Sequence, residues 1–152
     1  MKKPISTRTH GAIDYAWSAT AAALPSAMNG STATARLVRG AATTSAMSSM
    51  VTNYEWGKWR VLPMKLHLAL DVAMCSALIA SPLFLPATER RYAAIPVALG
   101  AAGLLTGLMT KTRSPLEIDE EFGGFSGPEQ ISTIADQDPD ITAAPHLRLH
   151  LE

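Results

Sequence analysis

The sequence predicts an all-α membrane protein with four transmembrane helices, arranged as two parallel repeated hairpins and followed by an acidic, mostly irregular C-terminal tail. Three observations lead to this fold class: long apolar stretches with little charge, an internal repeat, and an abrupt change of composition after residue 113. A length of 152 residues suits a single domain with a tail. We therefore assign residues 1–113 to the transmembrane domain and residues 114–152 to the tail.

Four stretches approach the roughly 20 apolar helical residues that cross a bilayer core of about 30 Å. They are residues 8–25, 36–53, 64–85 and 90–110. The second is rich in Ser, Thr and Ala, which suits a helix packed among other helices because small side chains allow close backbone approach. In the fourth, Gly103 and Gly107 place small residues on one helix face, which predicts packing within the bundle, with dimerisation as the alternative.

The basic residues orient the predicted bundle. Eight of them fall on one side of the four spans and four on the other, which predicts that both termini lie in the cytoplasm. The segment "NYEWGKWR" contains Tyr54, Trp56 and Trp59, which we interpret as anchors at the lipid–water interface. No basic patch suggests a nucleic-acid partner.

An internal repeat relates the first and third spans. A shift of 57 residues places His10 on His67 and Asp14 on Asp71 without a gap. Each copy is predicted to cross the membrane twice, so the two copies run in the same direction and their His–Asp pairs lie at equal depth. The prediction is two equivalent polar pairs close to the cytoplasmic face.

The segments "STRTHGAIDYAWSA", "TNYEWGKWRVLPMKLHLALDVAMCSALIASPLF" and "GLMTKTRSP" resemble the bacterial SPW-repeat integral membrane proteins. The likeness covers residues 5–115 and implies four spans with a His-x-x-x-Asp motif near the start of each repeat. This chain departs from the family signature, since Ser81-Pro82-Leu83 and Leu24-Pro25-Ser26 both lack the tryptophan. The resemblance implies a fold and a location in a bacterial inner (cytoplasmic) membrane, and it carries no established activity.

The two His–Asp pairs allow three interpretations. An intramembrane Asp normally faces the bundle interior and takes a partner, so His10, Asp14, His67 and Asp71 are first interpreted as structural polar pairs, within or between the repeats. Alternatively, His10 and His67 bind haem or a chlorophyll-type pigment, with the carboxylates orienting the imidazoles. In the third interpretation the pairs belong to a proton or ion pathway.

Motifs of soluble enzymes and of metal sites are absent from the sequence. Residues 117–140 carry eight acidic side chains and no basic one. Asp136, Asp138 and Asp140 lack the Gly and Glu that a calcium loop requires, and His146 and His150 are too few for a metal site. We therefore predict a protein with no resident cofactor or metal.

These observations predict a non-enzymatic structural or accessory subunit. Its partners would be the bilayer and a larger membrane complex, respiratory or photosynthetic, on which the tail 114–152 docks. The alternatives are a haem- or pigment-binding protein that uses His10 and His67, and a small transporter.

Overall fold

The structure is a computed structural model of the chain, and it describes residues 3–28 and 32–122. Within these ranges the chain is mostly helical and contains no strand, so the all-α part of the prediction is confirmed. The helices are α1 (Thr7–Ala23), α2 (Ala33–Val51), α3 (Met64–Ala80), α4 (Ala94–Met109) and α5 (Pro115–Phe122).

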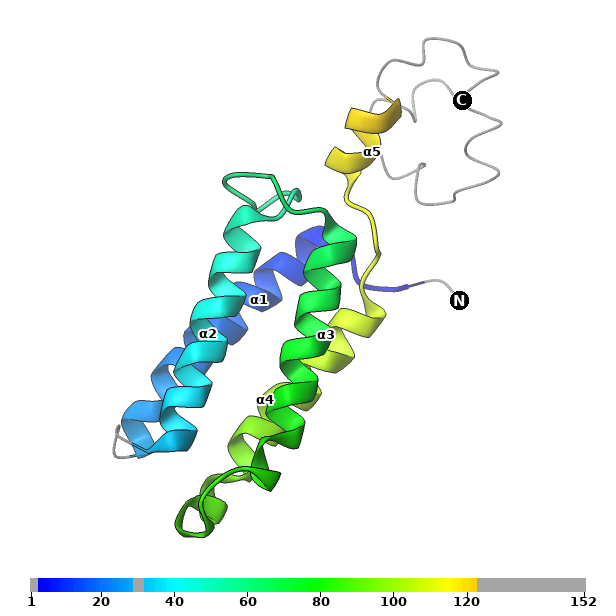
Figure 1. Ribbon diagram of the computed structural model, residues 1–152. Helices are drawn as coiled ribbons and strands as arrows, with labels where there is room; N and C mark the ends of the chain where they lie inside the picture. Colours follow the sequence, from blue (N-terminus) through cyan, green and yellow to red (C-terminus); the bar gives the residue numbers. More distant parts are fainter. Residues whose placement is uncertain (1–2, 29–31, 123–152) are drawn as a thin grey trace.

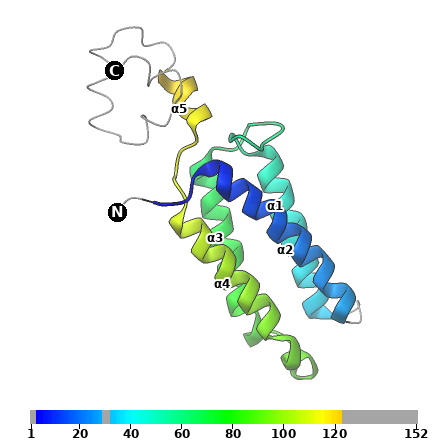
Figure 2. The same ribbon diagram turned by 180° about the vertical axis from the view of Figure 1, so that it is seen from behind.

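The first four helices form two antiparallel hairpins. Helix α1 packs along α2, and α3 packs along α4 (Figure 1). Helices α1 and α4 also touch, as do α2 and α3, so the hairpins close into a bundle. The view from behind shows α5 beyond the end where α1 and α3 begin (Figure 2). We call this end of the bundle the α5 end.

The helices begin where side chains satisfy their free N–H groups. The hydroxyl of Ser6 accepts from the N–H of Thr9 at the start of α1, and that of Thr32 accepts from the N–H of Ala35 at the start of α2. Such caps stabilise a helix by about 1 kcal/mol each. Helix α3 follows Pro63, which supplies no side-chain cap.

Proline marks the far ends of α1 and α3. Both helices continue into short 3-10 turns, η1 (Leu24–Met28) and η2 (Ser81–Leu83), which contain Pro25 and Pro82 respectively. A proline lacks the N–H that an α-helix would use at that position, so the regular helix stops there. A further 3-10 turn, η3 (Ala87–Tyr92), leads into α4.

Among the described residues, one segment is long and apolar enough to cross a bilayer. It is Met64–Leu83, with 20 residues and a mean hydropathy of 1.6. Helix α4 is apolar but has only 16 residues, about 24 Å at a rise of 1.5 Å per residue. The prediction of four transmembrane helices is therefore not supported: the polar content of α1 and α2 and the short length of α4 keep these helices below the requirement.

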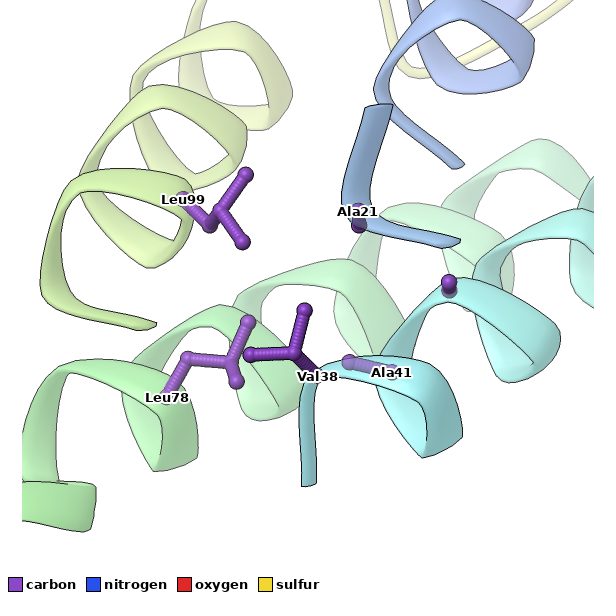
Figure 3. Packing of buried hydrophobic residues seen from close by; sticks show 6 residues of the cluster. Ala21, Val38, Ala41, Leu78 and Leu99 are labelled. Carbon is purple, nitrogen blue, oxygen red and sulfur yellow. The ribbon is translucent and has the colours of Figure 1, made fainter. Parts of the chain in front are cut away.

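An apolar core fills the half of the bundle that lies away from α5. Small side chains on α1 and α2 allow Leu78 of α3 and Leu99 of α4 to approach them across the bundle (Figure 3). The buried members of this cluster come from all four helices: Ala21, Val38, Ala41, Ala42, Leu78 and Leu99. This core holds the hairpins together where the bundle contains few polar groups.

Glycines bring α3 and α4 into close contact. A Cβ atom on Gly100 would lie 2.6 Å from the carbonyl oxygen of Cys75, and one on Gly103 would lie 2.6 Å from the sulfur of Cys75. Real Cβ atoms essentially never approach so closely. Gly107 is buried and faces Asp71 at an ordinary distance of 4.0 Å. Of the two predicted packing glycines, Gly103 thus contacts α3 more closely than Gly107. The close contact at Gly100 was not predicted from the sequence.

The start of the tail contacts the α5 end of the bundle. Residues Pro115–Phe122 form α5, where the sequence predicts mostly irregular structure. Glu117 accepts a hydrogen bond from the N–H of Met64 at 2.6 Å, and the buried Ile118 packs inward. Glu117 therefore supplies the cap that Pro63 does not. The rest of the tail, with Asp136, His146 and the other predicted residues, lies outside the described residues.

Candidate functional site

The two predicted His–Asp pairs meet in one cluster inside the bundle, near its α5 end. His10 and His67 are each the fourth residue of their helix, and Asp14 and Asp71 lie one turn further on. The two imidazole Nε2 atoms are 3.3 Å apart. We call these four residues the His–Asp cluster.

Each imidazole faces both carboxylates. The Nε2 atom of His10 lies 3.2 Å from an oxygen of Asp14 and 3.2 Å from one of Asp71. The Nε2 atom of His67 lies 3.0 Å from Asp14 and 3.2 Å from Asp71. The pairs therefore interact both within and between the repeats, and the cluster connects α1 to α3.

A threonine holds each imidazole from the other side. The Nδ1 atom of His67 lies 2.9 Å from the hydroxyl oxygen of Thr52, and that of His10 lies 2.9 Å from the hydroxyl oxygen of Thr110. Each threonine hydroxyl donates its hydrogen to the carbonyl four residues earlier, at 2.6 Å for Thr52 and 2.7 Å for Thr110. A hydroxyl has one hydrogen to give, so it accepts from Nδ1–H. Both imidazoles are therefore protonated at Nδ1, and both present Nε2 to the cluster.

Two main-chain contacts, one in each repeat, fix the helix ends around the cluster. Ile5 and Thr110 form one isolated bridge, and Leu62 and Thr52 form another. Ile5 and Leu62 are related by the same 57-residue shift as the two histidines. Each bridge ties the segment that precedes a histidine helix to the end of the helix beside it, so each threonine is held against its histidine.

The cluster is closed to solvent. His10 and His67 are at most 1% exposed, and Asp14 and Asp71 at most 7%. Ser49 of α2 donates a hydrogen bond of 3.1 Å to the Asp14 carboxylate. This end of the interior is polar: the described buried polar residues around the cluster also include Thr7, Ser45, Thr52 and Thr110.

The loop between α2 and α3 covers the cluster at the α5 end. The ring of Tyr54 is fully buried, with its centroid 5.9 Å from that of His67. This burial raises the pKa of the phenol well above its usual value. Tyr54 is thus an internal residue and does not face the lipid headgroups as the sequence predicts.

The two tryptophans of this loop are half-exposed. Trp56 donates from its indole N–H to the carbonyl of Arg8 at 2.9 Å, which fastens the loop to α1. Trp59 lies under the ammonium of Lys58, 5.3 Å from the ring centroid. Amphipathic rings paired with cations are typical of a lipid–water interface.

A haem or chlorophyll-type macrocycle does not fit between His10 and His67. Two axial ligands would place their Nε2 atoms about 4 Å apart on opposite sides of a metal, at about 2 Å each. Here the nitrogens are 3.3 Å apart, and both carboxylates lie within 3.2 Å of them, in the space that a macrocycle would occupy. The cavity bordering Asp14 and Asp71 has a volume of about 10 Å³, enough for about one water molecule.

Sequence reasoning identified the four members of the cluster and missed the residues that position them. Thr52 and Thr110 lie at the ends of α2 and α4, where nothing local distinguishes them from other threonines. The repeat offered a signal, because the two threonines are 58 residues apart, close to the repeat length. Ser49 gave no comparable signal.

Compared with protein-family models, curated proteins and solved structures, the chain matches none of them. The resemblance to the SPW-repeat proteins therefore stays a prediction, and the site is interpreted from its own geometry.

Proposed function

We propose that the chain is a non-enzymatic integral membrane protein of the SPW-repeat type that acts as a structural or accessory subunit. The observation that carries the proposal is the placement of polar groups inside the α5 half of the bundle and of large apolar side chains on the outside of α3 and α4. In water the opposite arrangement is favoured, whereas in lipid an internal polar cluster holds helices together.

The outer surface of the bundle is apolar along α3 and α4. Leu66 and Leu70 of α3 are 50% and 45% exposed, and Leu105 and Leu108 of α4 are 61% and 59% exposed. In the most apolar window of Met64–Leu83, 33% of the residues are buried. The core helix of a soluble protein would be mostly buried, so the exposed remainder supports contact with lipid.

The proposed arrangement has α3 crossing the bilayer, with α1, α2 and α4 beside it. The polar faces of α1 and α2 turn inward to the cluster, so the buried Asp14 and Ser49 do not contact lipid. Trp56 and Trp59 then lie at the cytoplasmic interface, at the end of the bundle where α5 is also found. The matching threonine contacts of His10 and His67 support the predicted internal repeat.

Cysteine accessibility tests the membrane location. In a Cys75→Ala background, Leu70→Cys on the outer face of α3 is compared with Val61→Cys in the loop, which is 75% exposed. In native membranes, a charged maleimide is expected to label Val61→Cys and to leave Leu70→Cys unlabelled until detergent is added. Equal labelling of both positions before detergent would place the bundle in water and refute the proposal.

The accessory role rests on the tail. Helix α5, with which the tail begins, is fixed to this end of the bundle through Glu117 and Ile118. We propose that the tail docks on a larger membrane complex. The test is isolation from native membranes in mild detergent, comparing the full chain with one shortened after residue 122. A defined set of partner chains that is recovered with the full chain and lost with the shortened one is expected; identical recovery would contradict docking through the tail.

Neither alternative gains a specific observation from the described residues. The pigment-binding interpretation conflicts with the geometry between His10 and His67. The transporter interpretation requires a site deep in the bilayer at a break in a helix. The cluster instead lies in the first turns of two continuous helices.

A further inference from the structure

The His–Asp cluster has the geometry of a metal-binding site. Five distances among the Nε2 atoms of the two histidines and the Oδ2 atoms of the two aspartates lie between 3.0 and 3.3 Å. All four atoms lie within 4.8 Å of one another. A tetrahedral ion with bonds of about 2.0–2.1 Å needs its six ligand–ligand separations to be about 3.3–3.4 Å. Five of the six are close to this value, and the sixth, between the two carboxylate oxygens, is at most 4.8 Å. We propose that His10, Asp14, His67 and Asp71 bind one divalent transition-metal ion, with Zn²⁺ as the best match.

The orientation of the imidazoles supports this proposal independently of the distances. A histidine that ligates a metal almost always donates its other ring N–H to an oxygen atom, which fixes its tautomer and direction. Thr52 and Thr110 accept from the two Nδ1–H groups in this way, and the hydroxyls have no further hydrogen to offer. Both Nε2 lone pairs are thereby directed at the same point, between the carboxylates.

The charges of the cluster also balance with a divalent ion. Two carboxylates bring two negative charges, and two imidazoles protonated only at Nδ1 bring none. A divalent cation neutralises the buried set, which a low-dielectric interior requires.

Two extra protons would also balance the charges, but they satisfy the geometry less well. Each Nε2–H could point at only one acceptor, so at most two of the five short contacts would be hydrogen bonds. The two N–H groups of His10 and His67 would also face each other across 3.3 Å. A single ion satisfies all four ligand atoms at once.

The site is closed and four-coordinate, which is typical of a structural metal and not of a catalytic one. All four ligands are buried, and Tyr54 covers them at the α5 end. The ligands come from α1 and α3, one helix of each hairpin. The ion therefore joins the two hairpins at the end of the bundle that lacks the large apolar core. This role goes beyond the proposed function, and it does not depend on where the protein resides.

Metal content and cobalt binding test the proposal. The full chain is purified in mild detergent and its metals are measured by mass spectrometry, then it is stripped with a chelator and titrated with Co²⁺. We expect one Co²⁺ per chain, with the strong visible bands of four-coordinate cobalt, and loss of these bands when Zn²⁺ is added. Failure of the stripped, folded protein to bind either ion would overturn the proposal.

Variants separate the ligands from the residues that position them. Asp71→Asn and His67→Gln are expected to weaken Co²⁺ binding by more than about 100-fold, and Thr52→Val and Thr110→Val by about 10–100-fold each. Thr43→Val is the matched control: its hydroxyl makes the same hydrogen bond to the carbonyl four residues earlier, is exposed, and touches no histidine. Binding by Asp71→Asn with the affinity of the unmodified chain would overturn the proposal.

Two further measurements test whether the tail histidines bind the ion and identify the ligands if the variants do not fold. His146→Gln with His150→Gln should leave Co²⁺ binding unchanged, whereas loss of binding in this variant would assign the ion to the tail. If the ligand variants do not fold, X-ray absorption of the unmodified zinc-loaded chain decides. Four nitrogen or oxygen neighbours at about 2.0 Å, with the signature of two imidazoles, are expected. A shell of six oxygens or a sulfur ligand would refute the assignment.

Discussion

Replacement of Gly100 by alanine is expected to destabilise the bundle, although alanine favours a helix. The new Cβ would lie 2.6 Å from the carbonyl oxygen of Cys75 and 3.0 Å from the Cβ of Leu78. Both neighbours belong to the body of α3, so the two helices must separate. Overpacking of this kind costs about 1–3 kcal/mol, and alanine recovers up to about 1 kcal/mol through helix propensity. The net loss in the free energy of unfolding is therefore up to about 2 kcal/mol.

Gly40 provides the matched control. It lies inside α2, and a Cβ atom there meets nothing within 4 Å. Gly40→Ala should therefore raise the free energy of unfolding by about 0.5–1 kcal/mol. The same substitution thus has opposite effects in two helices, and the difference of up to about 3 kcal/mol measures how closely α3 and α4 approach.

A substitution at Gly103 tests which atom of α3 causes the steric clash. Its Cβ would meet the sulfur of Cys75 at 2.6 Å, and Cys75→Ala removes that sulfur. Gly103→Ala should destabilise the chain alone and become neutral or stabilising in the Cys75→Ala background, with a coupling energy of about 0.5–3 kcal/mol. Gly100→Ala should show no such rescue, because its contact is with the backbone of Cys75.

Reversible unfolding in detergent, followed by near-ultraviolet circular dichroism, measures these differences. The reasoning is refuted if Gly100→Ala stabilises the chain as much as Gly40→Ala does. It is refuted also if Cys75→Ala rescues Gly100→Ala and Gly103→Ala equally, since the two positions would then not meet different atoms of α3.

Three further predictions concern helix caps and the loop. Glu89 accepts hydrogen bonds from the N–H and hydroxyl of Thr34 and from the N–H of Ala33, and these bonds lower the pKa of its carboxyl from the usual 4.5. The stabilisation by the ionised carboxylate should be complete above pH 4.5 and disappear as the pH falls through the lowered pKa. The melting temperatures of Glu89→Gln and of the unmodified chain should therefore differ at neutral pH and converge in acid. Glu117→Ala should remove the cap of α3, cost about 0.5–2 kcal/mol and speed amide exchange at Met64; unchanged exchange would contradict the cap. Trp56→Phe should lose the hydrogen bond to the carbonyl of Arg8 and cost about 0.5–1.5 kcal/mol in thermal unfolding, with no effect expected if the indole faces only lipid.

The helices follow closely from local sequence. Ser6 and Thr32 cap the starts of α1 and α2, and Pro25 and Pro82 end α1 and α3, because each residue acts on backbone groups within a few positions of itself. The predicted helical segments are accordingly present, with shifted boundaries. The number of spans was harder to predict, because a helix can be buried among other helices without being apolar.

The members of the His–Asp cluster could be predicted from the sequence, but their convergence into one cluster could not. The repeat relates His10 to His67 and Asp14 to Asp71, since identical local patterns place side chains at equal depth. The distances between the pairs could not follow from the repeat, because they depend on how the hairpins cross. Thr52, Thr110 and Ser49 were missed for the same reason: their roles exist only where α2 and α4 end beside the histidines.

By itself, then, the sequence determined that this chain forms helices with two equivalent polar pairs and an acidic tail. The tertiary structure decided that the four polar side chains meet as one closed set, and that Tyr54 is buried above them. The reason is physical: caps, prolines and periodicity act over one or two turns. The convergence of four ligand atoms within 4.8 Å is instead set by the packing of α3 on α4 through Gly100 and Gly103, and by the packing of α1 on α2 and α4.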